Sequence, residues 1–328
     1  MKPTFGIEEE VFVVEPYWPS FDSLYYLSRF LWKKPFAHYF RTASNFCLGE
    51  EISKGLMAGI EISTSIHTDL DELMRELACK RKFLAESCDG LILPLGSLIT
   101  DRSRSRTCAW QIHIGGVKNL KKVYANLVFY LPLLTLLTVN APFVQGRYFG
   151  QSFRMHYSFA IGSLASDWSY RFQDIIYSRR LKTIEIRVFD PIWDLERIRL
   201  LLELIRRIVL DEEELPLDRR GYNELRERVI TVGYGGYLSP LYQRLRKFAD
   251  LSEDIFRDTC SGQIRTLYQR CGLLGTYTAL DNAYRSGKLT ARPYIPQKSS
   301  HFLKMISGFL TYYIPKLPFS IYKIMREK

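Results

Sequence analysis

A strand-like run near the start of the chain, from Phe5 to Val14, places three consecutive carboxylates among β-branched and aromatic residues. Side chains alternate between the two faces of a strand, so Glu8 and Glu10 point to one face and Glu9 to the other. Two acids on one face of a buried strand are costly to desolvate unless something compensates them. A divalent cation bound by carboxylate oxygens is the usual compensation. The alternative is a solvated edge strand that carries a cluster of surface charge.

The rest of the chain is apolar enough to build a large core around such a strand. Its 328 residues are 47% hydrophobic and 14% aromatic, which excludes a disordered protein and allows one large domain or two ordinary ones. The formal net charge of +11 suits nucleotides, acidic substrates, nucleic acid or a membrane surface, without choosing among them. The six cysteines form no C-x-x-C pair and no metal-finger spacing, as in a reduced cytosolic protein. With no signal peptide before the acidic strand, we expect a cytoplasmic location.

One uncharged stretch, residues 125–145, resembles a membrane span, which needs roughly 20 apolar residues. Its polar residues and its two prolines, Pro132 and Pro142, favour a buried helix instead. We expect that helix to be kinked or restarted at Pro132 and to end near Asn140.

Periodicity predicts strands early in the chain and helices late. Beyond the first strand, extended segments are expected at residues 59–65, 91–95, 108–116 and 183–190. Helices are expected at residues 24–32, 69–88, 118–139 and 194–210, from about 222 and about 240, and at 262–286. Asp69 or Thr68, and Asp194, are the expected N-caps of two of them. Without a regular β-α alternation, this order predicts an α+β fold with a mainly antiparallel sheet.

Four predicted strands present metal-capable or phosphate-binding side chains in apolar surroundings. These side chains are Glu8, Glu10, Glu61, His113, Glu185 and Arg187. Carboxylate oxygens hold hard cations, and cations with an arginine neutralise the charge that develops on a transferred phosphoryl group. The set therefore suits phosphoryl transfer from ATP–Mg²⁺. Neither G-x-x-x-x-G-K-[ST] nor G-x-G-x-x-G occurs, which argues against the P-loop and dinucleotide-binding classes.

Several short motifs, in the same order along the chain, resemble the ATP-dependent carboxylate–amine ligases related to bacterial and plant glutamate–cysteine ligase. Each motif alone is weak, but together they cover residues 5 to about 230. They are the opening strand Phe5 to Glu10; Ile60 to Thr64, similar to L-E-x-x-T; Gln111 to Gly115, similar to H-V-H-V-G; Leu131 to Gly146, similar to a helix and S-x-N-S-P-F-x-x-G loop, with Arg154 after it; and Thr183 to Asp190, similar to T-x-E-V-R-x-x-D.

The resemblance implies a glutamine-synthetase-like fold whose antiparallel sheet forms an active-site funnel flanked by helices. It also implies that an amino-acid carboxylate, foremost the glutamate γ-carboxylate, attacks ATP and that an amine then displaces phosphate from the acyl phosphate. Mg²⁺, or Mn²⁺ in its place, would be bound by Glu8, Glu10, Glu61, His113 and Glu185. Arg187 would contact ATP phosphate, Arg154 the acid substrate or phosphate, and Gln111 would help bind the nucleotide. Residues 1–295 would form the catalytic domain.

The sequence departs from the family pattern where the substrates would bind. The loop G-[ST]-x-H-P is here Gly96 to Ile99, without histidine or proline, and the arginine of a D-x-R motif is missing after Asp174. In a helix motif N-x-W-R-x-x-R, Val229 replaces the second arginine; Arg179, Arg180 and Arg228 lie nearby as substitutes. ATP and metal binding are therefore better supported than the identity of the acid or the amine.

Two other classes of function stay open. A binding or regulatory protein on the same fold, with weak or no ligase activity, would fit the missing arginines. The complete set of acids, histidine and arginine argues against it, because buried acids without a cation destabilise a fold. Nucleic-acid binding rests on the net charge alone, and no recognition motif supports it.

The C-terminal segment, residues 296–328, lies outside the resemblance and reads as a basic amphipathic extension. Apolar residues from Phe302 to Ile314 recur at helical spacing among lysines and arginines. We expect a helix that docks on the body of the protein or on a second subunit of a homo-oligomer. Adsorption to a membrane surface is the alternative.

Overall fold

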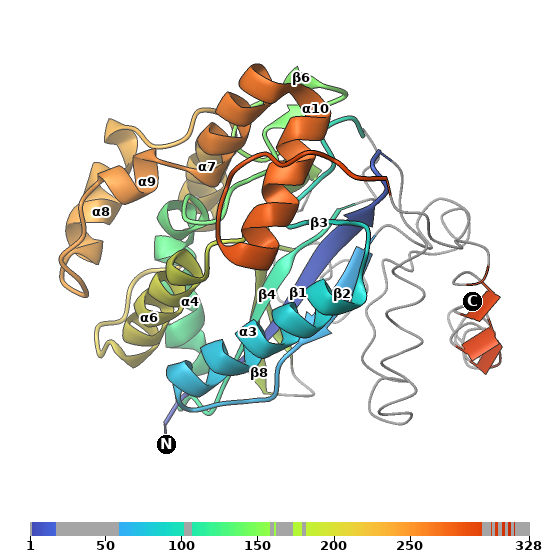
Figure 1. Cartoon of the computed structure of the whole chain (residues 1–328). Coiled ribbons are helices and arrows are strands. Elements are labelled where there is room, and N and C mark those ends of the chain that lie inside the picture. Colours follow the sequence, from blue (N-terminus) through green and yellow to red (C-terminus); the bar gives the residue numbers. More distant parts are fainter. Residues whose placement is uncertain are drawn as a thin grey trace.

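The computed structural model describes residues 2–17, 59–101, 107–157, 161, 173–178 and 182–296, and eight single residues after 296. Its centre is a six-stranded antiparallel sheet (Figure 1). The strands are β1 (Thr4–Val14), β2 (Gly59–Ser63), β3 (Leu91–Leu93), β4 (Trp110–Gly115), β7 (Ile175–Ser178) and β8 (Thr183–Phe189). They run in the order β2-β1-β4-β8-β7, and β3 pairs with the end of β1. The predicted α+β class and antiparallel sheet are therefore confirmed.

Period-2 alternation gives the sheet one apolar face. Its residues are Ile7, Val11, Ile60, Ile62, Trp110, Ile112, Ile114, Ile184 and Ile186, each at most 4% exposed. Helices cover this face and pack on one another. Figure 1 shows α3 (Leu70–Ser87) and α10 (Cys260–Ser286) in front of the sheet, with α4 (Leu120–Thr135) and α6 (Leu195–Leu210) beside them. α4 also contacts α7 (Arg219–Thr231) and α8 (Ser239–Leu245).

Two helix starts confirm the predicted caps. The Asp69 carboxylate accepts the backbone N–H groups of Asp71 and Glu72, and Asp194 does the same for Glu196 and Arg197. Each cap satisfies backbone donors that the first turn of a helix leaves unpaired.

Three details differ from the sequence-based expectations. The helix expected to reach residue 139 runs through Pro132 and ends at Thr135, inside a core that buries its last residues. The expected loop at 146–150 contains β6 (Arg147–Tyr148), which forms a small hairpin with β5 (Phe143–Val144). Gly272, with φ of 66°, interrupts α10, a left-handed conformation that glycine adopts without a steric cost.

The remaining elements are short: α5 (Phe153–Tyr157), a 3₁₀ turn η3 (Gly236–Leu238) and α9 (Asp254–Arg257). None of the described helices is both long and apolar enough to span a bilayer. The helix expected at 24–32 and the arginines at 179 and 180 lie outside the described residues. So does most of the C-terminal extension, and its docking stays a prediction.

Candidate active site

The strand register gathers the predicted metal ligands on the face of the sheet opposite the apolar one. Residues directly opposite each other in an antiparallel pair share a face. Glu10 lies opposite Glu61, and His113 lies opposite Glu185. Glu8 lies opposite Gln111, two residues from Glu10 on the same strand. The predicted sharing of one face is therefore confirmed for all five residues; a common cavity around them stays a prediction.

One contact among these five joins neighbouring strands. His113 Nε2 lies 3.3 Å from Glu8 Oε1, within ion-pair range. Burial opposes a charge on His113, but contact with Glu8 and the negative charge of Glu185 outweigh it, so the pKa of His113 is raised. The Nε2 atom is itself buried and makes no hydrogen bond of good geometry.

Glu10 lies where β1 passes the start of β4. The Ala109 N–H donates to Glu10 Oε2 at 2.8 Å. Burial raises the pKa of Glu10 to about 7, although this hydrogen bond and the charges of Arg187 and Arg154 act in the opposite direction. The carboxyl is therefore short of positive charge in its surroundings, which a bound cation would supply.

Arg187 contacts two other predicted site residues. Its Nη1 donates to Gln111 Oε1 at 2.8 Å and forms an ion pair with Glu185. The Arg187 side chain is 26% exposed and the Glu185 side chain 11%. The guanidinium is thus held from two strands while part of it stays accessible to a ligand.

A β-bulge places Arg187. Ile112 pairs with Ile186, but Trp110 pairs with Phe189, so β8 has one residue more than β4 over this interval. The N–H groups of Arg187 and Val188 both donate to the Asp174 carbonyl oxygen, at 2.8 and 3.1 Å. Bulges of this kind redirect a side chain and are common next to active sites.

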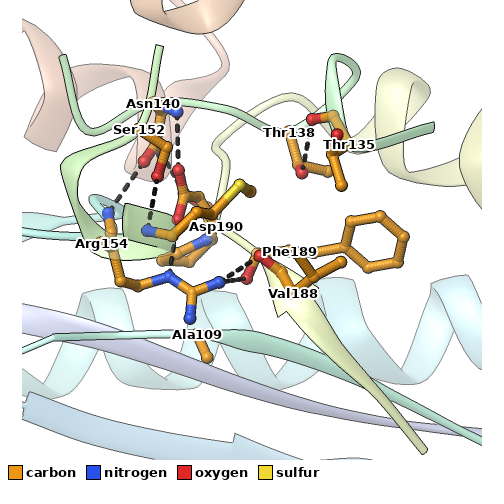
Figure 2. A network of polar contacts seen from close by, with 12 residues as sticks. Ala109, Thr135, Thr138, Asn140, Ser152, Arg154, Val188, Phe189 and Asp190 are labelled. Carbon is orange, nitrogen blue, oxygen red and sulfur yellow. Dashed lines mark hydrogen bonds and ion pairs between the residues drawn. The ribbon is translucent and has the colours of Figure 1, made fainter. Parts of the chain in front are cut away.

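Arg154 lies behind this bulge and is buried (Figure 2). Its Nε donates to Asp190 Oδ1 at 2.6 Å, and its Nη2 to the carbonyl oxygens of Val188 and, at 2.8 Å, Phe189. Figure 2 shows the remaining edge of the guanidinium directed toward Ala109. The contact with substrate or phosphate that the family resemblance implies for Arg154 stays a prediction.

Two other arginines, near the motifs that differ from the family pattern, have partners within the protein. Arg226 Nε pairs with the buried Asp174 carboxylate, which also accepts the Tyr222 hydroxyl at 2.8 Å. Arg228 stacks over the Tyr237 ring, with Cζ 3.9 Å from its centre. Asp174, in the motif that lacks its arginine, is therefore paired with an arginine of α7.

Glu9 is the acid that points to the covered face. It is fully buried, forms an ion pair with Arg81 of α3 and accepts the Tyr284 hydroxyl of α10 at 2.8 Å. Sequence reasoning did not find this pair. The signal was present, because Arg81 occupies a position on the apolar stripe of its helix, between Leu77 and Leu84.

A metal ion would require some side chains to turn. As they stand, no three or more His, Cys, Asp or Glu side chains of the described part of the chain are arranged to hold one. The donor set nevertheless fits a hard divalent cation, because carboxylates from three strands share a face with His113 Nε2, which is buried and contacts Glu8 without a hydrogen bond of good geometry. Mg²⁺ keeps several of its waters, so a few of these oxygens would suffice.

Comparison with known proteins places the fold. No protein-family model and no curated protein sequence matches the chain. Among solved structures, glutamate–cysteine ligase from Francisella tularensis, in complex with AMP, matches with a TM-score of 0.57 and 12% identity, over 96% of this chain and 94% of that one. A bifunctional glutathione synthetase from Pasteurella multocida matches with a TM-score of 0.56 and 13% identity, over 87% of this chain and 52% of that one. The resemblance to the glutamate–cysteine ligase family is thereby confirmed as a likeness of fold.

Proposed function

We propose, from a fold shared with glutamate–cysteine ligase, that this chain is an ATP-dependent carboxylate–amine ligase. The observation that carries the proposal is the polar face of the sheet. There, Glu8, Glu10, Glu61, His113 and Glu185 lie beside Arg187, in the fold of a protein that was solved with an adenine nucleotide. We infer that this face lines a glutamine-synthetase-like funnel for ATP and the acid substrate.

The chemistry asks little of the protein beyond placing and neutralising charge. A substrate carboxylate attacks the γ-phosphorus of ATP, ADP leaves, and an acyl phosphate forms. No general base is needed, because the nucleophile is already ionised, so positioning and charge neutralisation lower the barrier. The amine then attacks the acyl carbon, phosphate leaves, and the amide nitrogen loses a proton.

The described residues divide this work between them. Arg187 would bind the transferred phosphoryl group, with its guanidinium oriented by Gln111 and Glu185. The carboxylates of Glu8, Glu10, Glu61 and Glu185 and the imidazole of His113 would hold Mg²⁺, or Mn²⁺. When bound, the cation supplies charge neutralisation and a template for the phosphates.

The acid and the amine are the less determined part of the proposal. Glutamate, attacking through its γ-carboxylate, is the acid we favour; the amine is left open. The site differs from the family pattern in the substrate motifs, where Arg226 is committed to Asp174 and Met155 rather than to a ligand site. A changed acid or amine is therefore consistent with a retained nucleotide face.

A second candidate is a nucleotide- and metal-binding protein on the same fold without ligase turnover. It is favoured by one observation: Arg154 and Arg226, which come from the substrate motifs, are both buried in ion pairs within the protein. Such a protein would bind ATP–Mg²⁺ and form no product.

The deciding experiment combines binding with turnover. ATP binding is measured by calorimetry with and without Mg²⁺, and release of ADP and phosphate is screened with pairs of amino acids and amines. Mass spectrometry identifies any product, and hydroxylamine, added without an amine, traps an acyl phosphate as a hydroxamate. Binding with a product supports the ligase; binding without one across the screen favours the second candidate. Absence of ATP binding would refute both.

A further inference from the structure

We infer that Arg154 is a positioning residue, which orients Arg187 by holding the backbone of the β8 bulge, and is not itself a phosphate contact. The inference starts from the bulge. The N–H groups of Arg187 and Val188 both donate to the Asp174 carbonyl oxygen. The carbonyl oxygens at the bulge also need hydrogen-bond donors where they are buried.

Arg154 supplies these donors with one nitrogen. Its Nη2 lies 2.8 Å from the Phe189 carbonyl oxygen and 3.4 Å from that of Arg187, and it also bonds that of Val188. Arg187 is the first of these three residues, and its side chain extends from the bulge to Gln111. The planar guanidinium therefore sets the geometry of three consecutive peptide groups at once.

The guanidinium is fixed in turn by a buried polar network that Figure 2 shows. Asp190, fully buried, holds Arg154 Nε with Oδ1 and accepts the Asn140 N–H with Oδ2 at 2.9 Å. Asn140 bonds the Pro94 carbonyl oxygen and the Gly96 N–H, at 2.6 and 2.8 Å. A Cβ at Gly96 would overlap the Asp190 carboxylate, which explains glycine there. Arg154 is thus attached to the body of the fold on one side and to the bulge on the other.

This assignment divides the two arginines by task. The Nε and Nη2 atoms of Arg154 are occupied by protein acceptors, and the side chain is 8% exposed. Arg187 keeps a larger accessible part. Loss of the hydrogen bonds from Arg154 should let the backbone of the bulge change conformation and displace the Arg187 guanidinium. A displacement of about 1 Å at such a group can cost on the order of 10²-fold in rate.

The test uses the full-length protein and the variant Arg154→Lys, whose ammonium keeps the charge but cannot bond Asp190 and three carbonyls in one plane. Arg285→Lys is the matched control. Arg285 bonds Asp281 through Nε at 2.7 Å and the carbonyl oxygens of Ala85, Cys88 and Gly90, and it lies on α10, away from the polar face. Should Arg154→Lys fail to fold, Asp190→Asn loosens the same guanidinium while keeping side-chain volume.

Two readouts separate this inference from the proposed function. The catalytic part of the inference rests on the proposed function, and the structural part does not. The first is amide hydrogen exchange, which needs no ligand. Exchange of the Arg187 and Val188 amides should become about tenfold faster or more in Arg154→Lys, as expected for loss of a charge-assisted hydrogen bond, and stay unchanged in Arg285→Lys. Unchanged exchange at the bulge in Arg154→Lys would overturn the inference, whatever the protein catalyses.

The second readout is a double-mutant cycle with Arg187→Gln. ATP turnover and ATP affinity are measured for each variant in the cycle. If Arg154 acts through Arg187, then Arg154→Lys lowers turnover in the wild-type background and has no further effect in the Arg187→Gln background. Fully additive losses would show that Arg154 contacts the ligand independently and would overturn the assignment. If the wild type neither binds ATP nor turns it over, the proposed function fails. The exchange experiment alone then tests whether Arg154 holds the backbone of the bulge.

Discussion

Glu8 and His113 meet across neighbouring strands, with Glu8 Oε1 3.3 Å from His113 Nε2. The contact joins a hard oxygen donor to a softer nitrogen donor on the polar face of the sheet. Carboxylates suit Mg²⁺ and Mn²⁺ alike, whereas an imidazole favours transition metals over Mg²⁺. The pair is therefore the point at which the two candidate cations should be distinguished.

We expect His113→Gln to weaken Mn²⁺ binding by at least about tenfold, the lower end of the loss seen when even the outer partners of metal ligands are removed. Mg²⁺ binding, which depends on the carboxylates, should weaken less. Electron paramagnetic resonance of free Mn²⁺ and calorimetry with Mg²⁺ measure the two affinities. His156→Gln, on the exposed side of α5, is the control. Equal losses for both ions would show that His113 is not a ligand.

Arg187 and Glu185 should behave as a functional pair. We expect Arg187→Lys to lower ATP turnover by on the order of 10²–10³-fold, because an ammonium does not reproduce the fork of a guanidinium on phosphate oxygens. We expect Glu185→Gln to weaken the Mg²⁺ dependence. Melting temperature and turnover are measured on the same preparation. A lower melting temperature with near-normal specific activity would mean that Arg187 only neutralises Glu185 within the sheet.

The fold could be predicted wherever a local rule decides it. Period-2 alternation identified the faces of β1, β4 and β8, and aspartates before apolar periodic runs identified the starts of α3 and α6. The sequence left open whether the helix would be kinked or restarted at Pro132, and α4 continues through that residue. There, burial of the surrounding residues outweighs the loss of one backbone hydrogen bond, and that burial depends on the tertiary structure.

The candidate site was predictable as a set of residues on one face, and less so as a set of contacts. Alternation on separate strands fixes which side chains share a face, but not the bulge, which arises from a register shift between β4 and β8. The partners of the arginines come from distant segments: Arg154 and Asp190 are 36 residues apart, and Arg226 and Asp174 are 52 apart. Sequence alone gives no reason to pair them.

The ion pair of Glu9 and Arg81 should matter for stability and not for nucleotide binding. Both side chains are buried, and Arg81 also donates to the Trp193 carbonyl oxygen at 3.0 Å. Removing one partner leaves a buried charge, so we expect Arg81→Met to cost about 3–5 kcal/mol in free energy of unfolding. Urea unfolding measures this cost. Arg199→Met, which breaks an exposed pair with Asp71, should cost at most about 1 kcal/mol. Similar costs for the two variants would contradict the assignment.

Glu76 should make stability depend on acid pH. The carboxylate accepts the Ser65 N–H at 2.9 Å and contacts His67 Nε2 at 2.6 Å and Lys80 Nζ at 3.2 Å, which secures the segment after β2 to α3. Burial alone would raise its pKa, but these contacts outweigh burial and lower the pKa below the ordinary 4.5. A carboxyl with a lowered pKa in the folded state stabilises the fold above the unfolded-state value and loses this contribution as pH falls through the folded-state value.

We therefore expect Glu76→Gln to be less stable than wild type at pH 7, by on the order of 1 kcal/mol. The difference should persist down to about pH 5 and shrink progressively as the pH falls below the ordinary pKa of the carboxyl. Thermal unfolding of both proteins across this range measures it. A difference that stays constant from pH 7 to pH 3 would show that the side chain acts through packing and not through its charge.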